Sequence, residues 1–142
     1  QGGYGIQSAA GAAGLAPVVV NGDFTQQAGF SAGVALTRRD QRPDGVFAAN
    51  DMMALGCLYA FTQAGVQVPS DVALAGFDDI PLARFVHPSL TTMQVSIAEL
   101  GDMAMTRLMQ LMDGTSTDGT GDKQTLVPRL IVRDSTTPPS GR

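Results

Sequence analysis

Residues 43–56 read PDGVFAANDMMALG, and residues 68–79 read VPSDVALAGFDD. Each stretch contains a short apolar run, residues 45–49 in the first and residues 72–75 in the second, which ends in a pair of polar residues. Short apolar runs without polar alternation predict strands that are buried on both faces. The apolar residues 51–64 between them have the length of a helix. Strand, helix and strand in this order predict a parallel βαβ unit.

The same pattern extends upstream. Residues 17–20, Pro-Val-Val-Val, predict a third buried strand that leads into a polar turn. Thr25 is placed to cap a helix that runs to residue 39. Residues 4–10 predict a short helix, although each interior glycine costs a helix about 1 kcal/mol. The chain is therefore predicted to be an α/β protein with a parallel sheet.

Downstream, residues 81–85 predict a short helix. Residues 87–92 are predicted to be extended, because the residue before a proline avoids helical backbone angles. Residues 126–132 predict a last strand. Two polar segments complete the chain, a predicted loop over 114–123 and a predicted tail over 138–141.

The segment 97–112 has the clearest helical period. Its apolar residues form one stripe: Ile97, Leu100, Met103, Ala104, Leu108 and Leu111. Gly65 is placed to end the preceding apolar helix. For the helix over residues 97–112, the sequence shows no evident packing partner. A stripe this apolar requires a covering surface, and little else in a chain of this length is available to provide it.

Composition excludes several classes of function. The chain has 142 residues and a net charge of −4, so it is no electrostatic match for the phosphate backbone of a nucleic acid. The single cysteine excludes an intrachain disulfide and a cysteine-based zinc site. No apolar stretch approaches the ~20 residues of a transmembrane helix. The chain begins at Gln1 without a signal-peptide pattern, which suggests a processed chain or a piece of a larger protein.

Polar residues follow each predicted strand at its carboxyl end. They are Asn21 and Asp23, Asn50 and Asp51, and Asp78 and Asp79. Because ligands of open parallel sheets bind beyond the carboxyl ends of the strands, this edge is a candidate binding site. Asn and Asp are also good helix N-caps and turn formers, so some of the six have only that role.

Other motifs give weaker signals. No phosphate-binding glycine loop is present, and no loop has the ligand spacing of a metal site. Residues 29–33 fit the G-x-S-x-G pattern of serine hydrolases, but Ser31 lies inside a helical pattern rather than directly after a strand. We interpret Gly29 and Gly33 as sites of close helix packing. Cys57 is interpreted as a small buried apolar residue.

Four stretches together resemble LacI/GalR-type bacterial regulators. Residues 43–56 are similar to the P-x-A-[IV]-x-x-x-[ND]-D-x-x-A-x-G segment of that family, and residues 68–79 to its V-P-x-D-[IV]-x-[VL]-x-G-[FY]-D-[DN] segment. Residues 88–92 resemble its P-x-L-T-T, and residues 128–136 its closing P-x-L-[IV]-x-R-x-S-T. The four blocks occur in the family's order with similar gaps and cover most of residues 17–136.

The resemblance implies a type I periplasmic-binding-protein-like fold, in which an effector binds between two lobes behind a helix-turn-helix head. Residues 1–142 would be the C-terminal portion of the effector-binding and dimerisation domain, without the DNA-binding head. Residues 1–92 would form mainly the C-terminal lobe. Helix 97–113 would pack on the missing N-terminal lobe, and residues 124–136 would form a closing strand and tail.

The effector-contacting positions of the family fall on Phe24, Asn50 and Asp78. Phe24 would stack on the effector ring, while the Asn50 amide and the Asp78 carboxylate would hydrogen-bond to hydroxyl groups. Three neighbouring carboxylates receive supporting roles: Asp23, Asp51 and Asp79.

The family also dimerises through this lobe. The resemblance places the interface on four residues: Leu55, Leu58, Phe85 and Val86. An apolar Phe85–Val86 pair in a loop agrees with that, and local packing is the alternative.

The leading hypothesis is the effector-binding and dimerisation region of a cytoplasmic regulator. A small sugar or related metabolite would control DNA binding allosterically, and operator DNA would contact only the missing head. The hypothesis includes no catalytic residue, cofactor, metal or membrane partner. The alternative is a sugar-binding protein of an ABC-type transporter, which shares the fold and the two turns, although residues 88–92 and 128–136 argue against it.

Overall fold

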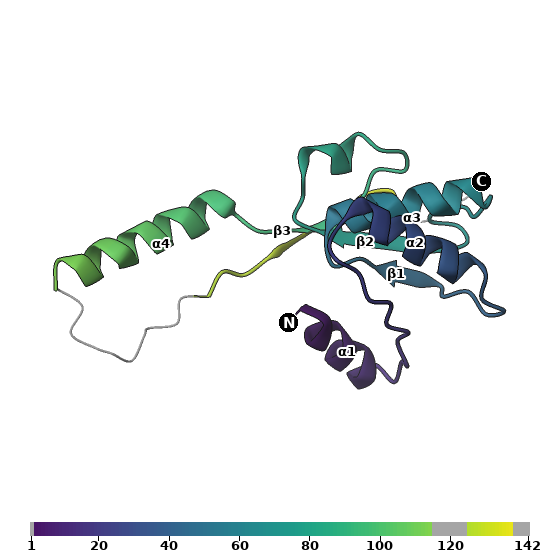
Figure 1. Ribbon diagram of the computed structural model, residues 1–142, viewed down its shortest axis with the longest axis horizontal. Coiled ribbons are helices and arrows are strands. Elements are labelled where there is room, and N and C mark those ends of the chain that lie inside the picture. The colour runs from purple at the N-terminus through teal and green to yellow at the C-terminus, as the bar shows by residue number, and fades with distance from the viewer. Residues whose placement is uncertain (1, 115–124, 138–142) are drawn as a thin grey trace.

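A four-stranded sheet forms the centre of the computed structural model, which describes residues 2–114 and 125–137 (Figure 1). The strands lie in the order β1 (Gly45–Phe47), β2 (Ala73–Phe77), β3 (Thr91–Gln94) and β4 (Arg129–Ile131). β1, β2 and β3 pair in parallel, and β4 pairs with β3 antiparallel. The α/β prediction and the βαβ unit are confirmed, with one antiparallel strand added at the edge.

Within the described residues, five helical segments accompany the sheet: α1 (Gly2–Ala12), α2 (Gln26–Thr37), α3 (Asp51–Gln63), the 3₁₀ helix η1 (Pro81–Arg84) and α4 (Ile97–Met112). α3 packs on β2, and α2 packs on α3. The core between them contains Phe61, Leu74 and Leu90, which are almost fully buried. The loop predicted over 114–123 lies outside the described residues from Thr115 on, as does the tail over 138–141.

The helix ends follow from capping. The Thr25 side chain accepts a hydrogen bond from the Ala28 amide and begins α2, as predicted. Gly65 has φ +71°, a backbone angle that glycine adopts without steric cost, and it lies directly beyond the C-cap residue of α3. α4 has the predicted bounds. β4 is shorter than the predicted 126–132, and its partner β3 occupies the end of the segment that was predicted only as extended.

Two predictions about the first strands are wrong. Residues 17–20 form no strand, and Val19 is 57% exposed. A run of valines favours extended backbone but does not supply the neighbouring strand that a sheet requires, and no partner pairs with it in the described part of the chain. β1 is therefore the edge strand of the sheet, and Phe47 is 39% exposed rather than buried.

Glycines allow α2 and α3 to pack closely, as predicted. A Cβ atom at Gly29 would lie 2.1 Å from the Met53 carbonyl oxygen, and one at Gly33 would lie 2.7 Å from the Ala60 Cβ. Ser31 lies in the middle of α2 and is exposed. It does not follow a strand, so the geometry of a hydrolase nucleophile is not formed there.

The single thiol should be unreactive in the native protein. Cys57 is buried between α2 and α3, its Sγ donates a hydrogen bond to the Gly29 carbonyl oxygen at 3.1 Å, and burial raises its pKa to about 11. The thiolate is the reactive form, so both access and ionisation oppose modification. We expect a disulfide reagent at mildly alkaline pH to label Cys57 only after denaturation. Rapid labelling of the folded protein would contradict this packing.

α4 lies apart from the sheet, at the far end of β3 and β4 (Figure 1). None of its residues is buried, and it has no substantial packing interface with another described helix or strand. The apolar stripe predicted from the sequence is therefore largely exposed, with Leu108 and Leu111 both more than half accessible and Met103 partly buried. None of the described helices combines the length and the apolar character needed to cross a membrane.

Candidate functional site

Three turns meet beside the carboxyl ends of β1 and β2. The Asn50 side-chain amide donates to the Phe24 carbonyl oxygen at 2.9 Å, which joins the turn before α2 to the end of β1. The Ile80 amide donates to the Asp51 Oδ2 at 2.9 Å, which joins the end of β1 to the turn after β2. The structure thus brings Phe24, Asn50 and the 78–80 turn into one continuous region.

Asn50 is the N-cap of α3. Its Oδ1 accepts from the Met53 amide at 2.8 Å while its Nδ2 binds the Phe24 carbonyl. A side-chain amide has two acceptor positions and two donor hydrogens, so each end of this group keeps one further hydrogen-bonding capacity. Asn50 can therefore position the Phe24 turn and still bind a hydroxyl group.

Asp51 is fully buried, and it supports the turn after β2 from the interior of the protein. Its carboxylate accepts from the Thr92 hydroxyl at 2.6 Å and from the Ile80 amide at 2.9 Å. Gly76 leaves room for it, since a Cβ there would overlap Asp51 Oδ1. Burial raises the pKa of the Asp51 carboxyl, and the hydrogen bonds from Thr92 and Ile80 oppose that rise. Asp51 therefore holds the turn after β2 and does not cap α3.

Asp78 presents a carboxylate without a partner among the described residues. Its backbone has φ 120°, and its amide donates to the Met93 carbonyl oxygen at 2.9 Å. Burial raises the pKa of the Asp78 carboxyl, and the nearby charge of Asp51 raises it further. An exposed acceptor with raised proton affinity and no partner among the described residues is suited to receive hydrogen bonds from a ligand.

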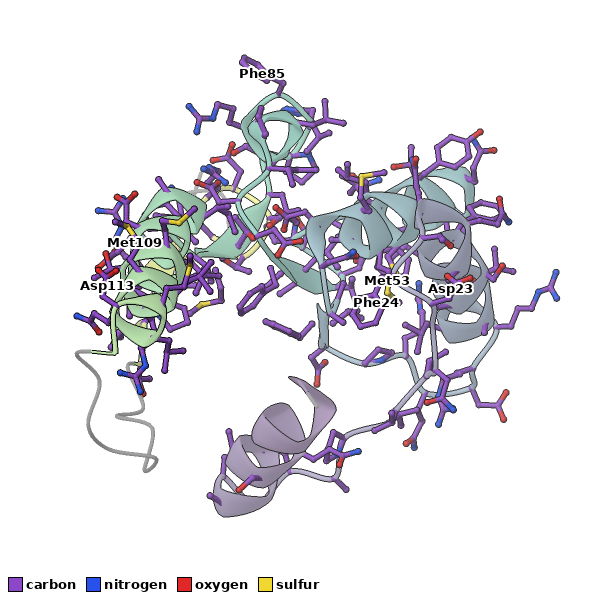
Figure 2. All side chains as sticks on the ribbon, turned by 60° about the vertical axis from the view of Figure 1, so that its left-hand side comes forward. Asp23, Phe24, Met53, Phe85, Met109 and Asp113 are labelled. Carbon is purple, nitrogen blue, oxygen red and sulfur yellow. The ribbon has the colours of Figure 1, made fainter. Side chains whose placement is uncertain are left out.

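Phe24 is 63% exposed and has a left-handed backbone, with φ 66°. The preceding Asp23 shapes this turn, because its carboxylate accepts from both the amide and the hydroxyl of Thr25. Both hydrogen bonds lower the pKa of Asp23, and the bond from the Thr25 hydroxyl has the larger effect. Figure 2 shows Asp23 and Phe24 close to Met53 at the start of α3. The turn thus exposes an aromatic side chain on the residue whose backbone carbonyl binds the Asn50 amide.

A shallow cavity of about 490 Å³ lies next to this turn. Asn21 and Asp23 line it, whereas Asn50 and Asp78 do not. The candidate site is therefore an open surface on this chain rather than an enclosed pocket. No group of three or more potential metal ligands occurs among residues 2–114 and 125–137.

Asp79 faces inward, away from Asp78. Arg133 Nη2 donates to its Oδ1 at 2.6 Å, and Gln94 Nε2 donates to its Oδ2 at 2.8 Å. Sequence reasoning missed Thr92, Gln94 and Arg133 as supports of the site. Thr92 and Arg133 lie in the Leu-Thr-Thr and closing blocks, which were used only as marks of a family.

The four residues predicted to form a dimer interface differ in how exposed they are in the structure. Phe85 is 76% exposed at the tip of the segment between β2 and β3 (Figure 2). Leu58 is part of the core, Leu55 is also buried, and Val86 packs partly against the core. Buried leucines have little surface for a partner. Of the four predicted residues, Phe85 is the one that is mostly accessible to a partner.

The sequence matches a known family over most of its length. The family model of the periplasmic binding protein-like domain matches residues 3–136. The transcriptional repressor PurR of Proteus mirabilis is 35% identical over 119 residues, which are 82% of this chain and 34% of that protein. A lactose operon repressor of Rhizobium radiobacter is 34% identical over 114 residues, which are 80% of this chain and 98% of that sequence. The matched region makes up 34% of this PurR relative and 26% of the ribose operon repressor of Escherichia coli, so the chain spans about a third or less of the length of these curated relatives.

Solved structures agree with this match. A LacI family regulator from Arthrobacter sp. FB24 in complex with lactose superimposes with a TM-score of 0.85 and 33% identity, covering 95% of this chain and 50% of that one. The lac repressor dimer bound to operator and the anti-inducer ONPF gives a TM-score of 0.86 at 29% identity, covering 94% of this chain and 46% of that one.

Proposed function

Because this chain belongs to the periplasmic binding protein-like effector domains of the LacI/GalR-type regulators, we propose that it is the effector-binding and dimerisation region of a transcriptional regulator. The effector would bind at the joined turns that carry Phe24, Asn50 and Asp78. DNA binding would be controlled from that site by a coupling free energy between effector and operator. The relatives with similar sequences are named as repressors, so the transporter alternative is not favoured.

The observation that carries this proposal is the chain of hydrogen bonds that joins the turns bearing the exposed Phe24 ring, the Asn50 amide and the Asp78 carboxylate. A carboxylate accepts strong hydrogen bonds from neighbouring hydroxyls, and an amide both donates and accepts. An aromatic ring suits the apolar face of a sugar ring. Together these groups favour a small carbohydrate, and the lactose complex of a structural neighbour supports that class.

The proposal extends to the rest of the parent protein. The exposed α4 stripe supports packing of helix 97–113 on an N-terminal lobe, with residues 1–92 in the C-terminal lobe. A homodimer would form through the face that carries Phe85. Operator DNA would be bound by a separate head, since a net charge of −4 does not suit this part for DNA. The parent protein would act in the cytoplasm and catalyse no reaction.

The direct test is a carbohydrate screen on the intact regulator purified from its natural source. Lactose and a panel of mono- and disaccharides are added while thermal unfolding is followed, with sorbitol as the open-chain polyol control. A sugar at 100 times its Kd stabilises the folded state by about 2.7 kcal/mol, which raises Tm by several degrees. If no sugar raises Tm above sorbitol, the carbohydrate assignment is wrong.

Sugar binding should weaken in mild acid. The ionised Asp78 carboxylate is the stronger acceptor, and its pKa is raised above the ordinary 3.8 by burial and by the charge of Asp51. Protonation therefore begins at a higher pH than for an aspartate with the ordinary pKa. We expect the affinity of the best sugar, measured by calorimetry, to fall as the pH decreases through the raised pKa of Asp78. An Asp78→Asn variant should lose this component of the pH profile. A wild-type profile identical to that of the variant would contradict the role of Asp78.

A further inference from the structure

Asn21 and Gly22 form the only Asn–Gly pair in the chain, which contains one other asparagine, Asn50. The pair lies in the segment without regular structure between α1 and α2, directly before the turn that carries Phe24. Glycine has no side chain to obstruct the approach of an asparagine side chain to the next backbone nitrogen. Asn–Gly is therefore the pair in which an asparagine most readily reacts with its own main chain.

The structure leaves both reacting groups of this pair unengaged. Asn21 and Gly22 are exposed, and neither the Asn21 side chain nor the Gly22 amide has a hydrogen-bond partner among the described residues. The neighbouring Asp23 carboxylate accepts from Thr25 instead. Both residues of the pair line the open cavity of about 490 Å³, so water reaches them. Ring closure at this pair thus breaks no described hydrogen bond.

Asn50 provides the opposite case within the same molecule. Its Oδ1 accepts from the Met53 amide, and its Nδ2 donates to the Phe24 carbonyl oxygen. Both hydrogen bonds would have to break before the Asn50 side chain could turn onto the next backbone nitrogen. That nitrogen belongs to Asp51, which is fully buried. The fold therefore protects Asn50 and leaves Asn21 open to reaction.

We propose that Asn21–Gly22 is a site of spontaneous deamidation, at which isoaspartate and aspartate form in the folded protein. The Gly22 backbone nitrogen attacks the Asn21 side-chain carbon Cγ and forms a bond with it. The bond from Cγ to Nδ2 breaks, and ammonia leaves with the proton of the Gly22 amide. One water from the solvent then opens the cyclic succinimide. Cleavage of the new bond to Cγ gives aspartate, and cleavage of the bond to the Asn21 main-chain carbonyl carbon gives isoaspartate.

Isoaspartate would alter the turn that carries Phe24, and its effect on a ligand rests on the proposed function. The main chain of isoaspartate passes through the side-chain carbons, which lengthens the backbone by one atom ahead of Gly22. Gly22 lies against the end of the Met53 side chain, since a Cβ on it would overlap Met53 Cε. Asp23 and Phe24 follow directly, and Figure 2 shows both close to Met53. The inserted atom therefore displaces Phe24 from Asn50, which binds its carbonyl oxygen.

The test follows both asparagines of the intact regulator by peptide mapping. Folded protein and protein unfolded in urea are incubated at mildly alkaline pH, because loss of the amide proton promotes the attack. Arg38 and Arg39 lie between Asn21 and Asn50, so cleavage after arginine places the two asparagines on separate peptides. Mass spectrometry measures the replacement of the side-chain NH₂ by OH. Protein isoaspartate methyltransferase then identifies isoaspartate in the isolated peptides, because it does not methylate L-aspartate.

Comparing each asparagine with itself in urea removes the effect of the neighbouring residue. We expect Asn21 to react in the folded protein at a rate within about threefold of its rate in urea, and Asn50 to react about tenfold or more slowly when folded. Asn21→Gln is the matched variant, and its peptide should stay unchanged, because the longer side chain must close a larger ring. An Asn21 peptide that converts in urea but stays unmodified in the folded protein would overturn the inference.

A second arm titrates lactose into fresh and aged samples of the same proteins. We expect the fraction of wild-type regulator that binds lactose to fall in proportion to its isoaspartate content. Aged Asn21→Gln should keep the affinity of its own fresh sample. Asn21→Asp carries the charge of the product on a normal backbone, so it separates the effect of charge from that of the inserted atom.

Undiminished lactose binding by a wild-type sample rich in isoaspartate would overturn the predicted displacement of Phe24. If the fresh regulator does not bind lactose, lactose is not the effector and the proposed function loses that support. The peptide map decides the modification of Asn21 by itself in either case.

Discussion

Replacing Asp78 with Asn should lower the affinity of the intact regulator for its best sugar by about 100-fold, or about 2.7 kcal/mol. The carboxylate of Asp78 has no partner among the described residues, so its hydrogen-bonding capacity is available to a ligand. Asn keeps the shape of the side chain but removes the charge and one acceptor oxygen. The substitution should leave folding intact, because no described contact depends on the carboxylate. Calorimetric titration of both proteins measures the difference.

Asp40→Asn provides the control for this titration. Asp40 is an exposed carboxylate in the connection between α2 and β1, away from the joined turns. Its replacement changes the net charge by the same amount and should leave affinity unchanged. Equal affinities for wild type and Asp78→Asn would remove Asp78 from the site, and an equal loss in both variants would indicate a general charge effect instead.

Replacing Gly56 with Ala should destabilise the folded chain by about 3 kcal/mol or more. A Cβ at this position would lie 2.0 Å from the Gln26 carbonyl oxygen and 2.6 Å from the Phe30 amide nitrogen. Both atoms belong to the backbone of α2, so no side-chain rotation relieves the overlap and the two helices must separate. Helix propensity alone would favour Ala over Gly by about 1 kcal/mol, so the sign of the effect reports the clash.

Gly101→Ala is the matched control in α4. A Cβ at Gly101 would meet no other atom within 4 Å, so propensity acts there alone. We expect this variant to be as stable as the wild type or slightly more stable in urea unfolding monitored by circular dichroism. If Gly56→Ala were equally stable, the close packing of α2 on α3 would be wrong.

The βαβ unit could be predicted because its signals are local. Apolar runs at residues 45–49 and 72–75 are separated by a helix of suitable length, and Gly65 ends that helix. Capping is also local, so Thr25 and the bounds of α4 were predicted correctly. A strand, in contrast, requires a neighbour that its own sequence does not specify. The valines of residues 17–20 have the right composition and lack that partner here.

The candidate site was predictable as a set of residue types but not as a set of contacts. The family resemblance assigned Asn50 to the effector and Asp51 to a supporting role, but it did not predict which of the two caps α3. The structure makes Asn50 the helix cap and Asp51 the buried brace. Asp79 and Arg133 are 54 positions apart, and only the antiparallel return of β4 beside β3 brings them together. Long-range pairing of this kind leaves no periodic signal in a single sequence.

The proposal that this chain serves a DNA-binding regulator is tested most directly by the intact protein in its natural source. Its mass is measured and its N terminus is sequenced after purification. We predict a chain similar in length to the PurR relative, of which the matched region makes up 34%. We also expect it to start with about 60 residues that have a helix-turn-helix pattern. A mature N terminus left by signal-peptide cleavage, with no such head, would contradict the account and assign the chain to a transport system.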